Sequence, residues 1–299
     1  MAPPTAAPAH PPSPSGSPYR HEAFSYRGDA EYVARITRFV REAVDAGEPV
    51  LVAVPAARLE LLRAPIADLH DHVRMLDMVD VGANPGRIIG MWSDFLETTG
   101  GQPSRGVGEV IRLDRDEQQL VECRIHDRLL DLAFAGRSFT LLSALDTAVE
   151  DGASALLPSG SIDVFSVPLP PSPGGARALD FSMADLSRTR ASVRAAAEAA
   201  GVTGTRLADL VLSVDEVATN ALVHGRADGV VRWWTEGGRF TCEISGGGTF
   251  VDPLVGRLRA GPDQPGGRGL WLANHLCDLV QVRNVDGGTV VRLRVDLDD

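Results

Sequence analysis

The chain has 299 residues, 44% of them hydrophobic and 23% charged, with a net charge of −11. That length suffices for two domains, each with its own core. No run of about 18 apolar residues is present, which excludes a membrane-spanning helix, and the acidic charge argues against direct nucleic-acid binding. All basic residues are arginine, because the sequence contains no lysine. Phosphate loops with a lysine and Schiff-base enzymes are therefore excluded.

Residues 1–19 are mostly proline, alanine and serine, without the basic and apolar segments of a signal peptide. We expect a disordered tail there. The three cysteines, Cys123, Cys242 and Cys277, are far apart and form no CxxC pattern. They favour a reducing compartment and argue against a zinc site, so we expect a cytoplasmic protein with buried thiols.

Residues 20–157 alternate between helical and strand patterns. Ala30 to Val44 has apolar residues at helical spacing, and Pro49 to Val54 is a short apolar run typical of a buried parallel strand. Further strands are expected at Val73–Leu76, Val110–Leu113 and Phe139–Leu142, with helices at Pro85–Leu96 and Glu117–Phe134 between them. This alternation predicts a three-layer α/β domain.

Residues 158–177 differ in composition from the blocks on either side. They contain SGS, PLPP and SPGG around one apolar stretch, Ile162 to Val167. Proline and glycine at this density favour a linker. We predict a domain boundary here, with the second domain at 178–299. From Pro168 to Gly175 the apolar surface looks too small to offset the entropy of ordering.

The second domain opens with a capping-box pattern at Ser182 to Asp185, followed by an alanine-rich helix that ends at Gly201. A second helix begins near Thr205, and its apolar residues recur every three or four positions. Strands follow at Val230–Thr235, Arg239–Ser245, Leu279–Asn284 and Thr289–Val295, with two glycine-rich hairpin turns. Two helices over a mostly antiparallel sheet predict a two-layer α/β sandwich.

The second helix also has a polar stripe that includes Glu216 and Asn220. Four positions apart, these side chains project from one helical face. A carboxylate and an amide oxygen so placed can bind hydrated Mg²⁺, and the carboxylate can orient or deprotonate an attacking hydroxyl. About forty residues later, Gly266 to Leu270 precede another helix. Backbone amides at a glycine turn and helix N-terminus bind phosphate without lysine.

Two segments of this domain resemble boxes of one superfamily. DLVLSVDEVATNALVHG is similar to the N-box of the GHKL (Bergerat) ATPases, specifically of anti-sigma-factor serine/threonine kinases, and GGRGLWLANHLCDLVQV resembles their second glycine box. The resemblance covers about Leu179 to Leu297. It implies that Asn220 holds Mg²⁺ and that Glu216 is the catalytic base or water-orienting group. It also implies a set of residues that bind the ATP cofactor: Asn220, Gly246, Gly248, Gly267, Gly269 and Leu270.

One position departs from the family. Between the two boxes the family has a DxGxG pattern, whose aspartate accepts the adenine amino group, and here this position falls on Ser245 or Gly246. The loss of a charge-assisted hydrogen bond costs about 1.5 to 3 kcal/mol, unless a water or Asp252 substitutes. Binding of ATP and Mg²⁺ is therefore an open question.

The first domain resembles the MEDS sensory domain, which is related to RecA-like folds but lacks a phosphate loop. The resemblance rests on RHEAFSYRGDAEYVARITRFVREAVDAGEPVLVAV, VDVGANPGRII and ECRIHDRLLDLAFAGRSFTLL, over about Arg20 to Asp146. In that family the domain often precedes an anti-sigma kinase module, as it does here. His21, Cys123 and His126 invite a ligand or metal role. A hydrogen-bonded structural role is the commoner one for a histidine beside leucines on a helix.

These observations favour an anti-sigma regulatory protein that binds a sigma factor and uses Mg-ATP to phosphorylate a STAS-domain anti-anti-sigma partner. The alternative is a non-catalytic switch that keeps the fold and has lost productive nucleotide use. An independent metabolic enzyme is disfavoured, since no further nucleophile and base pair occurs. The identity of the partners, the sensory ligand and the oligomeric state, including a homodimer, stay open.

Overall fold

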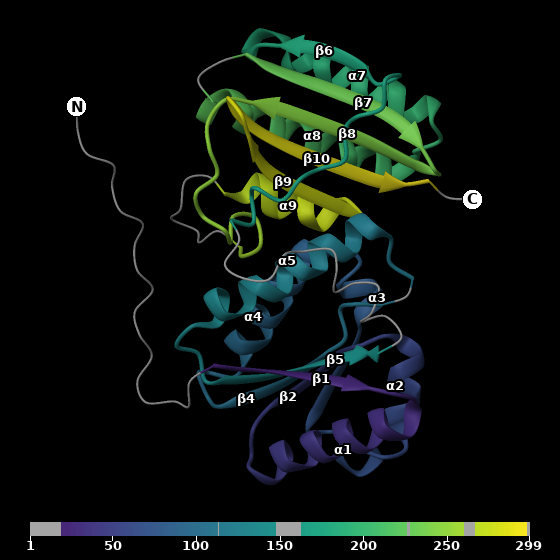
Figure 1. The fold of residues 1–299 in the computed structure, drawn as a ribbon, viewed down its shortest axis with the longest axis vertical. Helices are drawn as coiled ribbons and strands as arrows, with labels where there is room; N and C mark the ends of the chain where they lie inside the picture. Colours follow the sequence, from purple (N-terminus) through teal and green to yellow (C-terminus); the bar gives the residue numbers. More distant parts are fainter. Residues whose placement is uncertain (1–18, 113, 148–162, 226–227, 260–266, 298–299) are drawn as a thin grey trace, which may run out of the picture.

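A computed structural model of the chain describes residues 19–112, 114–147, 163–225, 228–259 and 267–297. Two five-stranded sheets, each with its own helices, make up the molecule (Figure 1). Residues 1–18 of the expected tail and residues 158–162 of the expected linker lie outside the described residues. No helix in the described part of the chain is long and apolar enough to cross a membrane.

The first sheet is parallel throughout, with strand order β1-β5-β4-β2-β3. Its strands are β1 (Arg20–Tyr26), β2 (Val50–Val54), β3 (Val73–Asp77), β4 (Ser104–Gly108) and β5 (Phe139–Asp146). Its helices are α1 (Asp29–Asp45), α2 (Ala56–Arg63), α3 (Met78–Val81), α4 (Ile88–Thr98) and α5 (Glu117–Phe134), with short 3-10 turns at Ala67–Leu69 and Pro85–Arg87.

Apolar side chains alternate along the strands, so the sheet has a core on each face. On one face Val52 packs with Ile36 and Phe39 of α1. On the other, Leu51 packs with Trp92 of α4 and Leu129 of α5. The predicted three-layer α/β architecture is confirmed.

The prediction of a strand at Val110–Leu113 is wrong. The strand is β4, Ser104–Gly108, and Val110 to Arg112 have no regular structure, while residue 113 lies outside the described part. A Cβ on Gly106 would lie 2.8 Å from the rings of Phe139 and Trp92, so glycine is required where these rings press on the strand. Glycine lowers the strand signal in a sequence, which explains the error.

The second sheet is antiparallel throughout, with strand order β6-β7-β8-β10-β9. Its strands are β6 (Arg177–Phe181), β7 (Gly229–Glu236), β8 (Arg239–Gly246), β9 (Leu279–Val285) and β10 (Gly288–Asp296). A 3-10 turn at Met183–Asp185 precedes α7 (Leu186–Ala199), α8 (Gly204–Gly225) and α9 (Arg268–Leu276), which cover one face (Figure 1). The predicted two-layer sandwich is confirmed, although edge strand β6 was not expected.

The described part of the expected linker packs against both domains. Val164, Phe165 and Val167 are buried in the α4–α5 core of the first domain. The Phe165 carbonyl accepts a 2.9 Å hydrogen bond from the Asn284 amide, and the Val167 carbonyl accepts one of 2.6 Å from Arg283 Nε. Residues 163–175 then cross the helix-free face of the second sheet (Figure 1). We call this segment the strap.

Helix α5 contacts the second domain through two carboxylates. Glu122 forms an ion pair with Arg283 in which both side chains are 3% exposed. Asp116, the N-cap of α5, accepts from Arg294 Nη1 at 2.7 Å and lies 3.0 Å from Arg239 Nη2. The helix that supports the first sheet therefore also anchors the second domain.

Candidate functional site

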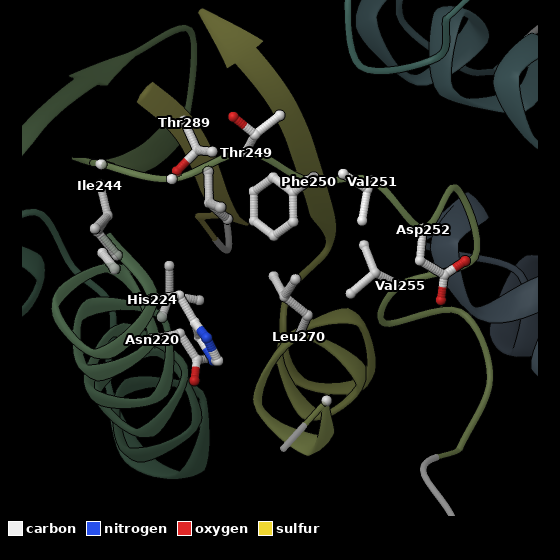
Figure 2. Close-up of a pocket in the computed structure, with 16 residues that line it drawn as sticks. Asn220, His224, Ile244, Thr249, Phe250, Val251, Asp252, Val255, Leu270 and Thr289 are labelled. Atoms are coloured by element: carbon white, nitrogen blue, oxygen red, sulfur yellow. The ribbon is translucent and has the colours of Figure 1, made fainter. Parts of the chain in front are cut away.

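A pocket of about 470 Å³ opens between α8, the ends of β8 and β10, and the start of α9 (Figure 2). This volume falls within the range of about 300–1,000 Å³ for small-molecule sites. Its deeper wall is apolar, with Val217 from α8, Ile244 from β8 and Val291 from β10. Phe250 and Leu270 face each other across the opening.

The polar residues Glu216, Asn220 and His224 of the site lie on helix α8. Asn220 lines the pocket, and His224, one turn later on the same face, does too. Glu216, one turn earlier, is half-buried and lies just outside the pocket lining. Leu210 and Val214, on the core-facing side of the helix, are fully buried in the domain core. The amphipathic pattern of α8 therefore fixes which side chains reach the pocket.

The start of α9 is pressed against these polar groups. Gly267 caps the helix with a φ of 82°, a conformation that favours glycine. A Cβ on Gly269 would lie 2.8 Å from both Glu216 Oε2 and Asn220 Nδ2, so only glycine lets the two helices come this close. The N-terminal end of α9, with Gly267 and Leu270 in the lining, therefore lies at the pocket beside Asn220. The first amides of a helix have no partner within the helix.

The end of β8 shows which of the two candidate positions for the aspartate, Ser245 or Gly246, is on the pocket side of the sheet. Side chains alternate along β8, so Ile244 and Gly246 face the helices while Ser245 faces the other side, 3.5 Å from Arg232 Nη1. Gly246 is not in the lining, since a Cβ there would lie 2.7 Å from the Ala221 Cβ. Gly248 lines the pocket, with a φ of 91°. The space for an aspartate at Gly246 is thus filled by Ala221.

Asp252 does not take over this role in the structure. It lies on the pocket rim and is exposed. Its Oδ1 accepts a 2.9 Å hydrogen bond from the Leu254 amide, which caps the turn that follows. Figure 2 shows the carboxylate directed away from Asn220 and Leu270. The carboxylate is therefore occupied in holding the loop.

Sequence reasoning missed several lining residues, among them His224, Phe250 and Thr289. The position of His224, four residues after Asn220, could have revealed it, because residues four apart share a helix face. Thr289 opens β10 and is 8% exposed, with its hydroxyl 3.5 Å from the Gly246 carbonyl. Nothing local to Phe250 or Thr289 indicates a pocket. The pairing of β10 with β8 brings Thr289 there, and the Asn284 side chain of β9 holds the Phe250 backbone.

The loop between β8 and α9 is held by the rest of the molecule. Asn284 of β9 accepts from the Phe250 amide and donates to the Phe250 carbonyl, both at 2.9 Å. The Phe250 ring lies 5.7 Å from the ring of Phe165 in the strap. Leu254 and Leu258 pack against the core of the first domain. One wall of the pocket is thus supported by the first domain.

The other histidine and cysteine candidates lie apart from this pocket. His21 Nε2 is 2.8 Å from the Ser143 hydroxyl, and Cys123 donates weakly to the Val110 carbonyl. His126 is buried on α5, and burial, followed by nearby Arg257, holds its pKa well below the usual value. Within the described ranges no group of three or more His, Cys, Asp or Glu side chains could hold a metal ion.

Two family models match the chain. Residues 180–295 match a model described as a histidine kinase-like ATPase domain. Residues 20–157 match one described as MEDS, the methanogen/methylotroph DcmR sensory domain. No curated protein matches the chain.

Proposed function

Because the chain joins a MEDS sensory domain to a histidine kinase-like ATPase domain, we propose that it is an anti-sigma regulatory protein with serine/threonine kinase activity. In this proposal the second domain binds Mg-ATP and phosphorylates a STAS-domain anti-anti-sigma partner. A sigma factor is the second partner, and the first domain governs the balance between the two.

The observation that supports this function most is the packing of Gly269 against Glu216 and Asn220. This contact brings a carboxylate, an amide and the free amides of a helix N-terminus to one side of a pocket of about 470 Å³. Such a set suits an anionic ligand with a divalent cation, because the amides attract phosphate and the oxygens attract Mg²⁺. The residues present therefore fit a magnesium nucleotide.

The pocket residues divide the work of binding and catalysis in this proposal. Mg-ATP supplies the phosphoryl group to be transferred. The Asn220 amide oxygen would ligate the metal, and the α9 amides would hold phosphate oxygens. Glu216, adjacent to both, would accept the proton of the attacking hydroxyl or orient it. The apolar wall of Val217, Ile244 and Val291 would receive the base.

A non-catalytic switch is the second candidate, and one observation favours it. Gly246 offers no carboxylate, and the Ala221 side chain fills the place where one would project. An adenine amino group in an apolar pocket without an acceptor costs about 1 to 3 kcal/mol. In this alternative the domain keeps its fold and partner surface while nucleotide binds weakly.

Calorimetry of the full-length protein with Mg-ATP and Mg-GTP tests the proposal. Asn220→Ala should abolish the Mg²⁺-dependent part of the affinity. Val223→Ala, on the same helix with a side chain 56% exposed, is the matched control and should bind like wild type. Transfer of labelled γ-phosphate to a STAS partner reports the kinase step. Tight partner binding without nucleotide and without transfer would favour the switch.

A further inference from the structure

A second pocket, of about 220 Å³, lies where the two domains meet. Its floor is Leu51 of β2 with Arg74 and Leu76 of the edge strand β3, which pair in register with β2 and project to the same face. Arg87, just before α4, forms a wall, and His275 of α9 closes the pocket from the second domain. Both domains therefore contribute to one site.

The polar groups of this pocket are mostly basic. Arg87, Met91 and Asp94 step by four and three along α4, so all three face the pocket. Arg87 Nε is buried and has no hydrogen-bond partner among the described residues. Burial also lowers the pKa of Arg87, as expected for a cation that is poorly compensated.

The surroundings leave this positive charge largely unbalanced. Arg74 adds a second guanidinium, and His275 adds an imidazole whose Nδ1 is 2.8 Å from the Trp271 carbonyl. The pKa of His275 is lowered, first by burial and then, despite the Trp271 carbonyl, by Arg87. Asp94 is the only carboxylate in the described lining, and it is exposed, as is Arg74. An anion would pair the half-buried Arg87 guanidinium, whose Nε is the buried, unpartnered atom.

The remaining lining is apolar and consists of Leu51, Leu76, Val81 and Met91. A bare inorganic anion would leave these side chains without a partner. We propose that the pocket binds a small organic anion with a short apolar chain, such as a linear monocarboxylate, whose charged group contacts Arg87, Arg74 and His275. The volume is below the range of about 300–1,000 Å³ for drug-sized ligands, which fits a molecule of this size.

Helix α9 connects this pocket to the first one. His275 near its C-terminal end lines the anion pocket, while Leu270 and the capping Gly267 line the larger pocket. Leu270 and His275 are five residues apart on the helix, so about 7.5 Å of helix separates the two sites. An anion that shifts α9 would move the amides that face the larger pocket. This coupling rests on the proposed nucleotide site, whereas anion binding does not.

Calorimetry of the full-length protein with hexanoate tests the inference, with hexanol and hexylamine as neutral and cationic controls. We expect hexanoate to bind and the two controls to fail at concentrations up to about 10 mM. A series from acetate to octanoate should show affinity rising with chain length, since each buried methylene adds to binding. Equal binding of hexanol, or no binding by any member of the series, would overturn the inference.

Three variants within the pocket and one control outside it locate the site. Arg87→Met keeps the apolar stem and should weaken hexanoate binding by about tenfold or more, and Arg87→Lys, which keeps the charge, should weaken it less. Arg63→Met, an exposed arginine on α2, should change nothing. If Arg87→Met fails to fold, Arg87→Lys and His275→Gln still test the site. Both should bind hexanoate more weakly than wild type, whereas the Arg63→Met control should bind it as wild type does. Unchanged binding in all of them would place the ligand elsewhere.

A final titration separates the two proposals. If hexanoate binds and shifts the Mg-ATP affinity by about threefold or more, reciprocity requires the same shift in hexanoate affinity when Mg-ATP is present. Hexanoate binding without any Mg-ATP binding supports the anion site and contradicts the nucleotide proposal. Mg-ATP binding without hexanoate binding supports the nucleotide proposal and contradicts the anion site.

Discussion

Asn84 and Asn274 lie 190 residues apart in the chain, and the Asn84 Nδ2 donates to both the backbone carbonyl and the Oδ1 of Asn274, each at 3.0 Å. Both side chains are buried. Asn84 Oδ1 also accepts from the Gly86 amide, and Asn274 Nδ2 donates to the Gly256 carbonyl in the loop before α9. The first domain, the loop and α9 thus share one buried polar network.

We expect Asn84→Ala to lower the free energy of unfolding by about 1–3 kcal/mol, because buried partners of a removed group are left unsatisfied. It should also speed hydrogen exchange of the α9 amides. Asp77→Ala is the matched control, since Asp77 likewise accepts from a backbone amide, but that of Val79 within its own domain. Equal exchange of α9 in both variants would show that Asn84 does not hold this helix.

The buried ion pair between Glu122 and Arg283 should be sensitive to loss of one partner. Glu122→Gln leaves the Arg283 guanidinium buried without its charge partner, which costs about 3–5 kcal/mol. The double variant Glu122→Met with Arg283→Met should recover much of that loss. Glu60→Gln, which breaks the exposed pair with Arg63, should change stability by less than about 1 kcal/mol in urea unfolding. Equal losses from Glu122→Gln and Glu60→Gln would refute this prediction.

The acceptor missing from the larger pocket should be restorable at one position only. Gly246 faces the pocket side of β8 but is blocked by Ala221, so we expect Gly246→Asp to need Ala221→Gly as well. The pair should raise ATP affinity about tenfold, or about 1.4 kcal/mol, and improve discrimination against GTP. Ser245→Asp, which faces the opposite side, is the control and should have no effect. A gain from Ser245→Asp would mean that the strand end has another register.

Two residues on α8 should separate stability from ligand binding. Leu210 is fully buried, so Leu210→Ala should lower the free energy of unfolding by about 2–5 kcal/mol. Asn220→Ala should change it far less, because Asn220 is half-buried at the pocket wall. Thermal and urea unfolding measure both. Equal loss in the two variants would assign Asn220 a structural role.

The contact between α5 and β10 should weaken in acid. Burial acts to raise the pKa of Asp116, but the Gln119 amide, Arg294 and Arg239 outweigh it, so the pKa is lowered. A carboxyl with a lowered folded pKa contributes stability that is complete above its unfolded pKa of about 3.9 and disappears as pH falls through the folded pKa. We expect Asp116→Asn, which can still cap α5, to be less stable than wild type at pH 7.

The difference between wild type and Asp116→Asn should then shrink between about pH 5 and pH 2, as the wild-type carboxylate is protonated. Urea midpoints across this range measure it. Glu60→Gln removes a carboxylate that pairs with Arg63 on the surface and serves as the control for general acid effects. A difference that stays constant down to pH 2 would mean that the charge of Asp116 contributes nothing.

Local patterns predicted most of the fold. Helix α5 begins and ends at the predicted residues, because Asp116 and Gln119 form a capping box and apolar residues recur at helical spacing. Strand β4 was misplaced because its two glycines meet Trp92 and Phe139, whose positions depend on packing distant in sequence. Edge strands β1 and β6 pair on one side only, and their half-polar sequences give a weak signal.

The same limit applies to the candidate sites. Asn220 and Gly267 could be found from spacing along the chain, and the structure brings them to one pocket. That Ala221 fills the space beside Gly246 could not be found, because it depends on the approach of α8 to β8. The anion pocket also could not be predicted from the sequence, since its floor and its closing histidine come from different domains.

The strap and the loop before α9 have a consequence for synthesis of the protein. The α4–α5 side of the first domain is covered by Val164, Phe165 and Val167, and further by Leu254 and Leu258. On a ribosome that adds about 5–20 residues per second, the roughly 90 residues from Val167 to Leu258 take on the order of 5–20 s to appear. During that interval the nascent first domain exposes apolar surface around α5. We expect chaperones to bind the incomplete chain during synthesis. We also expect chains truncated before residue 250 to aggregate.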